Sequence, residues 1–249
     1  EMCIRDRLLC GPRTQAGAVV PLKGTAPTLT SFVGDYNRET GLARTSGTFN
    51  TNRAGDADNQ NNKHVAVYPS FIEYGSNATV LCSIIGNGTA SGATVIHANS
   101  AGLTIKANSA SNAIGNQAGY ASNLIGISIN SDTDTQVLYN GNIGKISYTT
   151  TTPLSLSMLL YGGAGLASSI SRVAFYSMGD ALDLLSLQNI LNIYLSRLSR
   201  YFDSTYSMTD SDAIAYVSGV SSLNGVASMG YTYRKGINDF VSGCKTDGI

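Results

Sequence analysis

Paired carboxylates are the groups in this sequence whose spacing comes closest to a known chemistry. Asp132 and Asp134, in the segment NSDTDT, are two positions apart, so a strand would place both on one face. Two carboxylates on one face flank the sugar bond in retaining glycoside hydrolases, as nucleophile and acid. The Glu-x-Asp-x-x-Glu pattern of such a strand is absent, because the chain has only Glu1, Glu39 and Glu73. Turn-forming residues around the two aspartates favour a solvated loop, so the sequence predicts no catalytic residue and a protein that is not an enzyme.

A second polar segment, RAGDADNQNNKH, ends at His64. Asp56, Asp58 and Asn59 in it resemble the start of a calcium loop, but the glycine of the sharp turn and the distal glutamate are missing. The segment is predicted either as a solvated loop that enters the next strand or as a calcium- or glycan-binding loop. Together with Asp132 and Asp134, these residues are the candidate ligand-binding side chains, and Ca²⁺ is the one cofactor left open.

Cysteine and histidine give no metal-binding pattern. The chain contains Cys3, Cys10, Cys82, Cys244, His64 and His97. The cysteines lack the spacing of zinc ligands, so they are predicted as free thiols and no residue is predicted as a metal ligand. Each histidine lies in or beside a predicted strand, which indicates a surface residue or a hydrogen-bonded core residue.

The charge content excludes two classes of partner. Only 13% of the residues are charged and the formal net charge is zero. The basic footprint of a nucleic-acid-binding protein is therefore absent, as is a polybasic patch for membranes. No apolar run approaches the ~20 residues of a membrane span. A low content of charged residues with a net charge of zero suits a subunit of a larger, multimeric assembly.

The residues that could bind a ligand must be positioned by β-strands. Short apolar runs bounded by Gly, Asn and Ser predict strands at residues 63–70, 78–85, 93–98, 102–107, 123–130, 135–140, 144–149, 154–161 and 171–177. In the first run, Val65 and Val67 share one face and Ala66 takes the other. Asn140 and Gly141 stand between two runs and predict a hairpin turn, because both residues tolerate positive φ. Many short strands at close spacing predict an all-β sandwich.

A one-sided apolar stripe predicts a C-terminal amphipathic helix over residues 186–201. Its members are Leu187, Ile190, Leu191, Tyr194, Leu195 and Leu198. Ser186 is the predicted N-cap residue, since its hydroxyl can accept from a free backbone N–H. The stripe is expected to cover an open edge or mouth of the sandwich.

Two segments resemble the concanavalin A-like, or laminin G-like, jelly roll. Val137–Asn142 (VLYNGN) resembles a hairpin of that fold, and Arg172–Leu191 resembles its last strand with the short helix that follows. Phe32–Tyr68, together with this strand and helix, resembles structural proteins of tailed bacteriophages, in which such a segment leads into a lectin-like sandwich. The resemblance covers nearly all of residues 8–249 and implies a surface protein of the virion, similar to a tail fibre or appendage.

The resemblance implies adhesion to a host glycan through the lectin-like domain. The expected partners are a glycan or other virion subunits, with neither nucleic acid nor membrane insertion. The expected location is the virion, after synthesis in the host cytoplasm. A purely structural decoration or spacer domain is the alternative, and a glycoside hydrolase or lyase is disfavoured by the scarcity of glutamates.

The pattern of the chain predicts four segments. Residues 1–7 (EMCIRDR) differ in composition from the rest and resemble a translated sequencing adapter. Residues 8–24 are predicted as the end of a preceding segment or a linker, and residues 25–203 as the jelly roll with its helix. Residues 204–249 read as the truncated start of a following helical module.

Overall fold

The computed structural model describes residues 5–12, 14–22, 25–117, 123–131 and 133–202. The chain divides into two compact units, Glu1–Asn192 and Ile193–Ile249. The predicted helical module at 204–249 lies outside the described residues. The features that follow belong to the first unit.

The described strands form a single antiparallel sheet, in which each strand is hydrogen-bonded to at least one other. Along the main path the order is β11-β10-β9-β4-β13-β3-β12-β5-β6-β7-β8, while β1 pairs with β13 and β2 pairs with β3. The first elements are β1 (Arg5–Leu8), α1 (Gln15–Ala18), β2 (Thr28–Asn37), β3 (Gly41–Ala54), β4 (Lys63–Phe71), β5 (Cys82–Gly86) and β6 (Val95–Asn99). They are followed by β7 (Gly102–Lys106), β8 (Ile114–Gln117), β9 (Ile125–Ser131), β10 (Asp134–Tyr139), β11 (Asn142–Ile146), β12 (Ser157–Leu160), β13 (Arg172–Gly179) and α2 (Leu184–Phe202).

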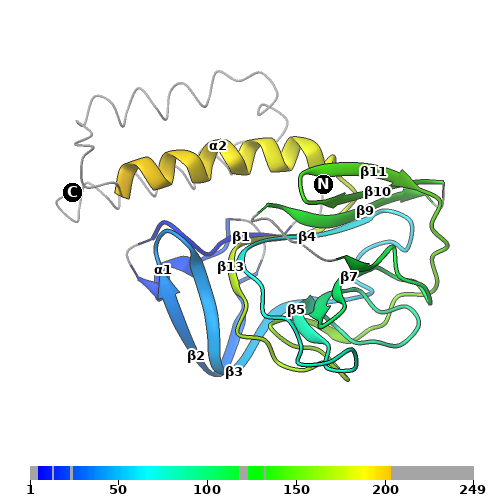
Figure 1. Ribbon diagram of the computed structural model, residues 1–249, viewed down its shortest axis with the longest axis horizontal. Coiled ribbons are helices and arrows are strands. Elements are labelled where there is room, and N and C mark those ends of the chain that lie inside the picture. Colours follow the sequence, from blue (N-terminus) through cyan, green and yellow to red (C-terminus); the bar gives the residue numbers. More distant parts are fainter. Residues whose placement is uncertain (1–4, 13, 23–24, 118–122, 132, 203–249) are drawn as a thin grey trace. The chain divides into compact units, whose positions relative to one another are not determined.

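The sheet curls on itself, so that its two halves enclose the core. Figure 1 shows β9, β10 and β11 on one side of this unit and β5 and β7 on the other, and β7 contacts β9 between them. The core takes side chains from both halves, including Val65, Ile127, Ile96 and Ile105. An apolar core between two packed layers of strands is the jelly-roll-like arrangement, which confirms the prediction of an all-β sandwich.

Alternation along the strands decides which side chains enter this core. In β4, Val65 and Val67 belong to the core cluster and Ala66 takes the opposite face, as the sequence predicts. The turn at Asn140 and Gly141 joins β10 to β11, and both residues have positive φ, 50° and 76°. This pair of angles is typical of a type I′ turn, whose twist matches that of the flanking strands. The predicted hairpin is therefore confirmed.

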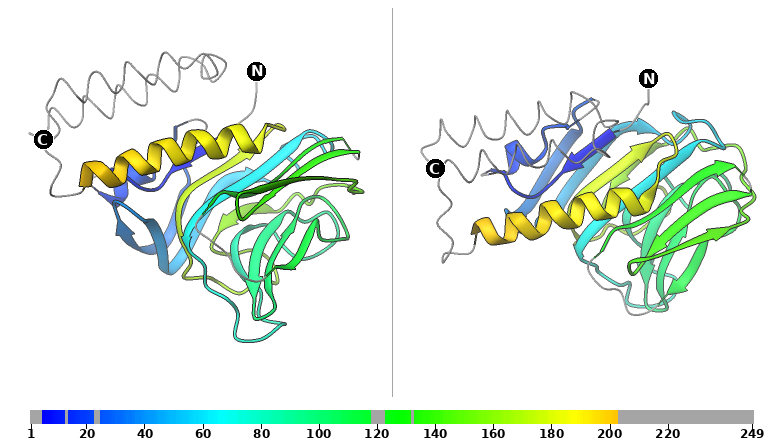
Figure 2. Two further views of the ribbon diagram at one scale, coloured as in Figure 1. Left: turned by 45° about the horizontal axis from the view of Figure 1, so that its top comes forward. Right: turned by 90° about the horizontal axis from the view of Figure 1, so that it is seen from above.

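The long hairpin of β2 and β3 was not predicted strand by strand. It is drawn in blue in Figure 2 and joins the sheet beside β13. The turn is held by the Oδ1 atom of Asn37, which accepts from the backbone N–H groups of Glu39 and Thr40. The following Gly41 has φ 97° and lies against the carbonyl of Val173, where a side chain would clash.

The C-terminal helix begins two residues earlier than predicted. Asp183, not Ser186, is the N-cap residue: its carbonyl accepts from Leu187 N and its Oδ1 accepts from Leu185 N at 3.2 Å. Ser186 instead donates its hydroxyl to the other carboxylate oxygen of Asp183 at 2.5 Å. In the part of α2 within the first unit, Leu184, Leu187 and Leu191 are buried, which confirms the apolar stripe there.

Residues of the suspected adapter take part in the sheet. Arg5–Leu8 pair with Phe175–Met178 of β13 as strand β1. The ladder of a sheet joins backbone N–H and C=O groups, which every residue except proline supplies. This pairing therefore does not distinguish native residues from adapter-encoded ones, and the adapter origin of residues 1–7 stays a prediction.

Candidate functional site

The candidate site lies on the outer face of the half-sheet formed by β4, β9 and β10. In β9, Ile125, Ile127 and Ile129 point into the core and are fully buried. Because successive side chains alternate, Ser128 and Asn130 point to the outer face. The same alternation in β10 turns Val137 inward and leaves Asp134 and Gln136 outward.

Strand register aligns four of these outward residues across the sheet. His64 pairs with Ser128, Ser128 pairs with Gln136, and Gln136 pairs with Lys145. Directly opposite residues of antiparallel strands point to the same face. A row of polar side chains therefore runs from β4 to β11.

The loop between β13 and α2 is fixed over this row by three hydrogen bonds. The imidazole Nδ1 of His64 bonds to the carbonyl oxygen of Asp180 at 2.6 Å. The backbone N–H of Ala181 donates to Asn62 Oδ1, and that of Leu182 donates to Ser128 Oγ, both at 2.9 Å. The loop thereby forms a wall of a pocket whose floor includes Ser128 and Gln136 of the polar row.

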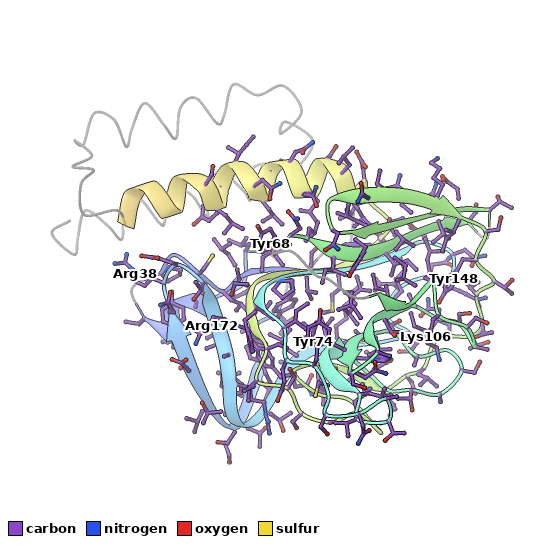
Figure 3. All side chains as sticks on the ribbon, viewed as in Figure 1. Arg38, Tyr68, Tyr74, Lys106, Tyr148 and Arg172 are labelled. Atoms are coloured by element: carbon purple, nitrogen blue, oxygen red, sulfur yellow. The ribbon has the colours of Figure 1, made fainter. Side chains whose placement is uncertain are left out.

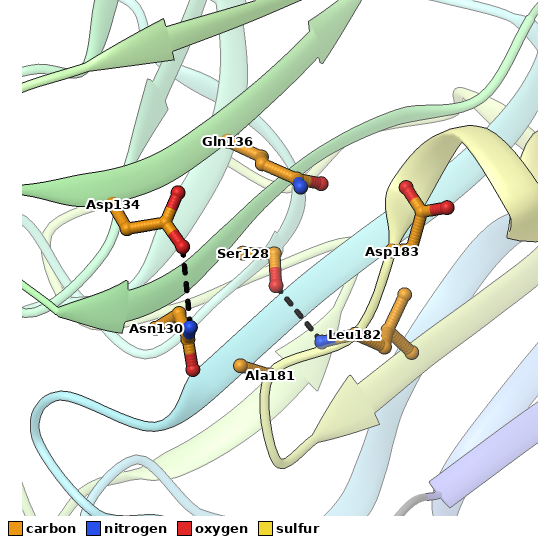
Figure 4. Close-up of a pocket in the computed structure, with 7 residues that line it drawn as sticks. All are labelled: Ser128, Asn130, Asp134, Gln136, Ala181, Leu182 and Asp183. Carbon is orange, nitrogen blue, oxygen red and sulfur yellow. Dashed lines mark hydrogen bonds between the residues drawn. The ribbon is translucent and has the colours of Figure 1, made fainter.

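This pocket has a volume of about 240 Å³ and a mostly polar lining (Figure 4). It is lined by Ser128, Asn130, Asp134, Gln136, Ala181, Leu182 and Asp183. Figure 4 shows Asn130 and Asp134 together at one end and the side-chain amide of Gln136 near Asp183 at the other. The pocket thus offers a hydroxyl, two amides and two carboxylates to a ligand.

The two carboxylates of the pocket have different partners. Asp134 accepts from Lys145 Nζ at 2.9 Å and from Asn130 Nδ2 at 3.2 Å. These hydrogen bonds, that of Lys145 above all, lower the pKa of Asp134, so it is an anion at neutral pH. Asp183 is exposed and accepts from Leu185 N and Ser186 Oγ at the start of α2.

Among the described residues that line the pocket, Gln136 carries the one buried side-chain polar atom without a partner. Its Oε1 atom is buried and has no hydrogen-bond partner. A buried acceptor without a donor costs about 1–3 kcal/mol, which a water molecule or a ligand donor would recover. Because the atom has almost no accessible surface, a donor in the pocket reaches it when the Gln136 side chain turns toward the pocket.

A histidine and a serine beneath the pocket have the geometry of a base and its nucleophile. Ser177 Oγ lies 2.5 Å from His64 Nε2, and His64 Nδ1 is held by the Asp180 carbonyl. A carbonyl only accepts, so Nδ1 carries the proton and Ser177 donates to Nε2. Both side chains are completely buried, and burial lowers the pKa of His64 to about 4. The pair is closed to substrate and supports the loop; the prediction of a hydrogen-bonded core histidine is confirmed at His64.

The candidates predicted from sequence are not gathered at one place. Asp58 is buried in an ion pair with Arg53, while Asp56 and Asn59 are exposed in the same loop. Asp132 lies outside the described residues. Of the four candidates in the part of the chain that the structure describes, only Asp134 lines the pocket.

Four polar lining residues were not singled out as site residues: Ser128, Asn130, Gln136 and Asp183. Each strand residue among them is the outward member of an alternating run, which is the only signal that the sequence gives. Asp183 belongs to a segment read only for its helix. Nothing local indicates that this segment faces β9 and β10.

Other reactive side chains offer no second site in the part of the chain that the structure describes. No group of three or more His, Cys, Asp or Glu residues there is placed to hold a metal ion. Cys10 and Cys82 are free and buried, as predicted for the cysteines, and burial raises the pKa of Cys10 to about 12. His97 is also buried, and its Nδ1 has no partner, so it matches neither the surface residue nor the hydrogen-bonded core residue that the sequence predicts.

The described tyrosines differ in exposure, and two of them, Tyr74 and Tyr148, are labelled in Figure 3. Tyr148, Tyr161 and Tyr176 are buried, so their rings are closed to a sugar, whereas Tyr74 is 40% exposed.

The described helices include none long and apolar enough to cross a membrane.

No protein-family model matches the sequence, and no curated protein matches it either. Among solved structures, the chain is similar to domain 4 of a GH43 extracellular arabinanase from Geobacillus stearothermophilus, solved in complex with arabinotriose. The TM-score is 0.45 with 11% identity, over 74% of this chain and 99% of that one. It is also similar to a mutant of Trypanosoma rangeli sialidase displaying trans-sialidase activity, with a TM-score of 0.43 and 13% identity over 75% of this chain. The match covers 36% of the sialidase chain.

These two likenesses concern the β-fold, and both structures come from carbohydrate-active proteins. They correct one prediction. The sequence predicted that the chain is not an enzyme, and this is contradicted, because an arabinanase and a sialidase are both enzymes. That prediction is withdrawn.

Proposed function

We propose that this chain binds a glycan through the pocket between β9, β10 and the loop at Ala181–Asp183. The observation that carries the proposal is the buried, unpaired Oε1 of Gln136 in a pocket lined by hydroxyl, amide and carboxylate groups. A sugar presents hydroxyls, each of which both donates and accepts. A hydroxyl that donates to Gln136 Oε1 would remove the penalty of the unpaired acceptor.

The remaining lining fits a sugar ring. Asp134 and Asp183 keep oxygen lone pairs for further hydroxyl donors, because each carboxylate has about four acceptor sites. Ala181 and Leu182 supply apolar surface for the C–H face of the ring. The volume of about 240 Å³ is below the ~300–1,000 Å³ of pockets for drug-sized ligands, so it suits one sugar residue.

The biological setting completes the proposal. We place the domain on a virion surface, where many copies bind a host glycan together. A small, open polar site gives weak binding at one copy, and avidity raises overall binding by ~10²–10⁴ when several copies engage at once. The support is the sequence resemblance to tailed-phage structural proteins and the low charge of the chain.

The test is a glycan array probed with the full chain displayed on a multivalent carrier. The expected result is binding to a defined set of sugars, followed by NMR titration of the chain with the best one, which also reveals turnover. Gln136→Leu removes the acceptor with little change of volume and should weaken binding about tenfold. Asp56→Asn, in the other candidate loop, is the matched control and should leave binding unchanged.

Two outcomes would overturn the proposal. One is no binding to any sugar by a chain whose melting temperature shows that it is folded, which favours the structural spacer. The other is loss of binding in Asp56→Asn but not in Gln136→Leu. Melting temperatures of both variants show whether a loss reflects unfolding.

A further inference from the structure

The charges around the pocket indicate which sugars it takes. We infer that the pocket selects uncharged sugars and amino sugars, and rejects sugars that carry a carboxylate, sulfate or phosphate. This inference rests on the glycan-binding proposal and adds a ligand class to it.

Negative groups outnumber positive groups at the site. Asp134 and Asp183 line the pocket, and Asp180 belongs to the same loop. No Lys, Arg or His is among the lining residues. The nearest cation along the polar row is Lys145, whose Nζ is bonded to Asp134 Oδ1. With its side chain 69% exposed, Lys145 neutralises Asp134 from the solvent side.

The start of α2 has the opposite sign and must be weighed against Asp183. A helix N-terminus carries about half a positive charge and attracts anions. Asp183 is the N-cap residue, so its full negative charge lies at this terminus and its carboxylate takes the Leu185 N–H. The sum at this wall is about half a negative charge. An anionic ligand therefore meets a repelling wall rather than a helix N-terminus.

The size of the effect follows from Coulomb's law. A unit negative charge about 6 Å from half a unit of negative charge, at an effective dielectric constant of about 40 for a half-open site, binds about threefold more weakly than a neutral group. A protonated amine gains from the same field, and a neutral sugar is indifferent to it. Because the pocket opens to solvent, salt should weaken both effects.

The acceptors support the same preference. Gln136 Oε1 has no donor, and the two carboxylates have room for donors beyond those that they already have. Sugar hydroxyls and ammonium groups donate, whereas carboxylate and sulfate oxygens only accept. An acidic sugar group that faces these residues would bring acceptor oxygens against acceptor oxygens, and no hydrogen bond could form between them.

The experiment uses the full chain and matched probes. The probes are neutral hexose oligosaccharides, the corresponding uronic acid oligosaccharides, which differ by a carboxylate, and glucosamine oligosaccharides, measured by NMR titration at 0.05 M and 0.5 M NaCl. Neutral or amino probes should bind about threefold more tightly than their uronic acid counterparts, and this ratio of affinities should shrink at high salt. The ratio of affinities should also be smaller in Asp183→Asn than in the native chain. Asparagine also caps a helix, so this variant preserves the loop. Asp56→Asn should not change the ratio.

The outcomes separate this inference from the proposed function. Binding of uronic acid probes as tight as that of neutral ones, or tighter, overturns the inference while the glycan site stands. A ratio that is the same in Asp183→Asn and in the native chain also overturns it. Absence of binding by all three probe classes and by the array overturns the proposed function, and the inference with it.

Discussion

Replacing Asp58 by alanine should destabilise the protein by about 3–5 kcal/mol. Arg53 donates through Nε to Asp58 Oδ2 at 2.9 Å and through a terminal nitrogen to Oδ1. The two side chains are only 6% and 2% exposed. Without the carboxylate, the guanidinium stays buried without its counter-charge, which is the costly way to break an ion pair. That loss is a large part of the ~5–15 kcal/mol that stabilises a typical domain.

The measurement is urea unfolding at pH 7, followed by far-ultraviolet circular dichroism. Asp56→Ala is the matched control: the residue is exposed two positions away and should change stability by less than about 0.5 kcal/mol. A double variant, Arg53→Met with Asp58→Leu, removes both charges and should recover most of the loss.

The same series decides between a structural and a calcium-binding role of this loop. Equal stability of the Asp58→Ala variant and the native chain would refute the structural role. A rise of the melting temperature on adding CaCl₂, lost in Asp58→Ala, would support a calcium loop instead. The ion-pair explanation requires that calcium have no effect on the melting temperature of the native chain.

Two further predictions concern the pH dependence of stability, and a third concerns the turn between β10 and β11. Burial lowers the pKa of Lys63 from 10.5 to about 7, so the unfolded state binds more protons between these values. Stability in urea should therefore rise from pH 7 to 9 by up to about 1.4 kcal/mol per pH unit, and Lys63→Met should remove the rise. Burial lowers the pKa of His64 from 6.5 to about 4, so stability should fall as the pH drops through this window, and less steeply in His64→Gln. A pH series that superimposes on that of the native chain would contradict either assignment. Gly141→Ala should cost about 1 kcal/mol because φ is 76°, whereas Gly144→Ala, with open space at the added carbon, should be nearly neutral; equal costs would be inconsistent with strain at the turn.

Local periodicity was enough to predict the strands that alternate strictly. β4 and β9 place Val or Ile inward at every second residue, and the pattern needs no knowledge of partners. β3 could not be found this way, because its buried positions include Thr51 and Arg53 as well as Phe49. Those polar groups are tolerated because each has a partner: Thr51 donates to the carbonyl of Met158, which is far along the chain, and Arg53 pairs with Asp58 in the loop that follows β3.

The residue at which a helix begins was harder to predict than the presence of the helix. Asp183 and Ser186 are both residues that favour the N-cap position. The choice falls on Asp183 because Leu184 is buried and must already be helical to pack. Tertiary packing therefore decided between two local signals of similar strength.

The candidate site depended on register, which the sequence does not show. Ser128 and Gln136 are ordinary polar members of alternating strands, and only the pairing of β9 with β10 makes them neighbours. The wall of the pocket comes from a loop more than 40 positions further along the chain. Asp58 and Asp134 look equivalent as sequence, yet one is buried against Arg53 and the other faces the pocket.

The pocket is held in shape by groups that no ligand touches. Ser177 donates to His64 Nε2, and His64 Nδ1 donates to the Asp180 carbonyl, so side chains on the outer face of β13 and β4 fix the loop that forms the pocket wall. A wall that is ordered before binding spares the ligand the cost of ordering it. His64→Phe should therefore weaken glycan binding although residue 64 lies outside the lining, and it should do so through the loop. Hydrogen exchange at Ala181 and Leu182 should increase in that variant and not in Gln136→Leu, which removes a ligand contact and leaves the support intact. If both variants lose binding with unchanged exchange at these two amides, the wall does not depend on His64.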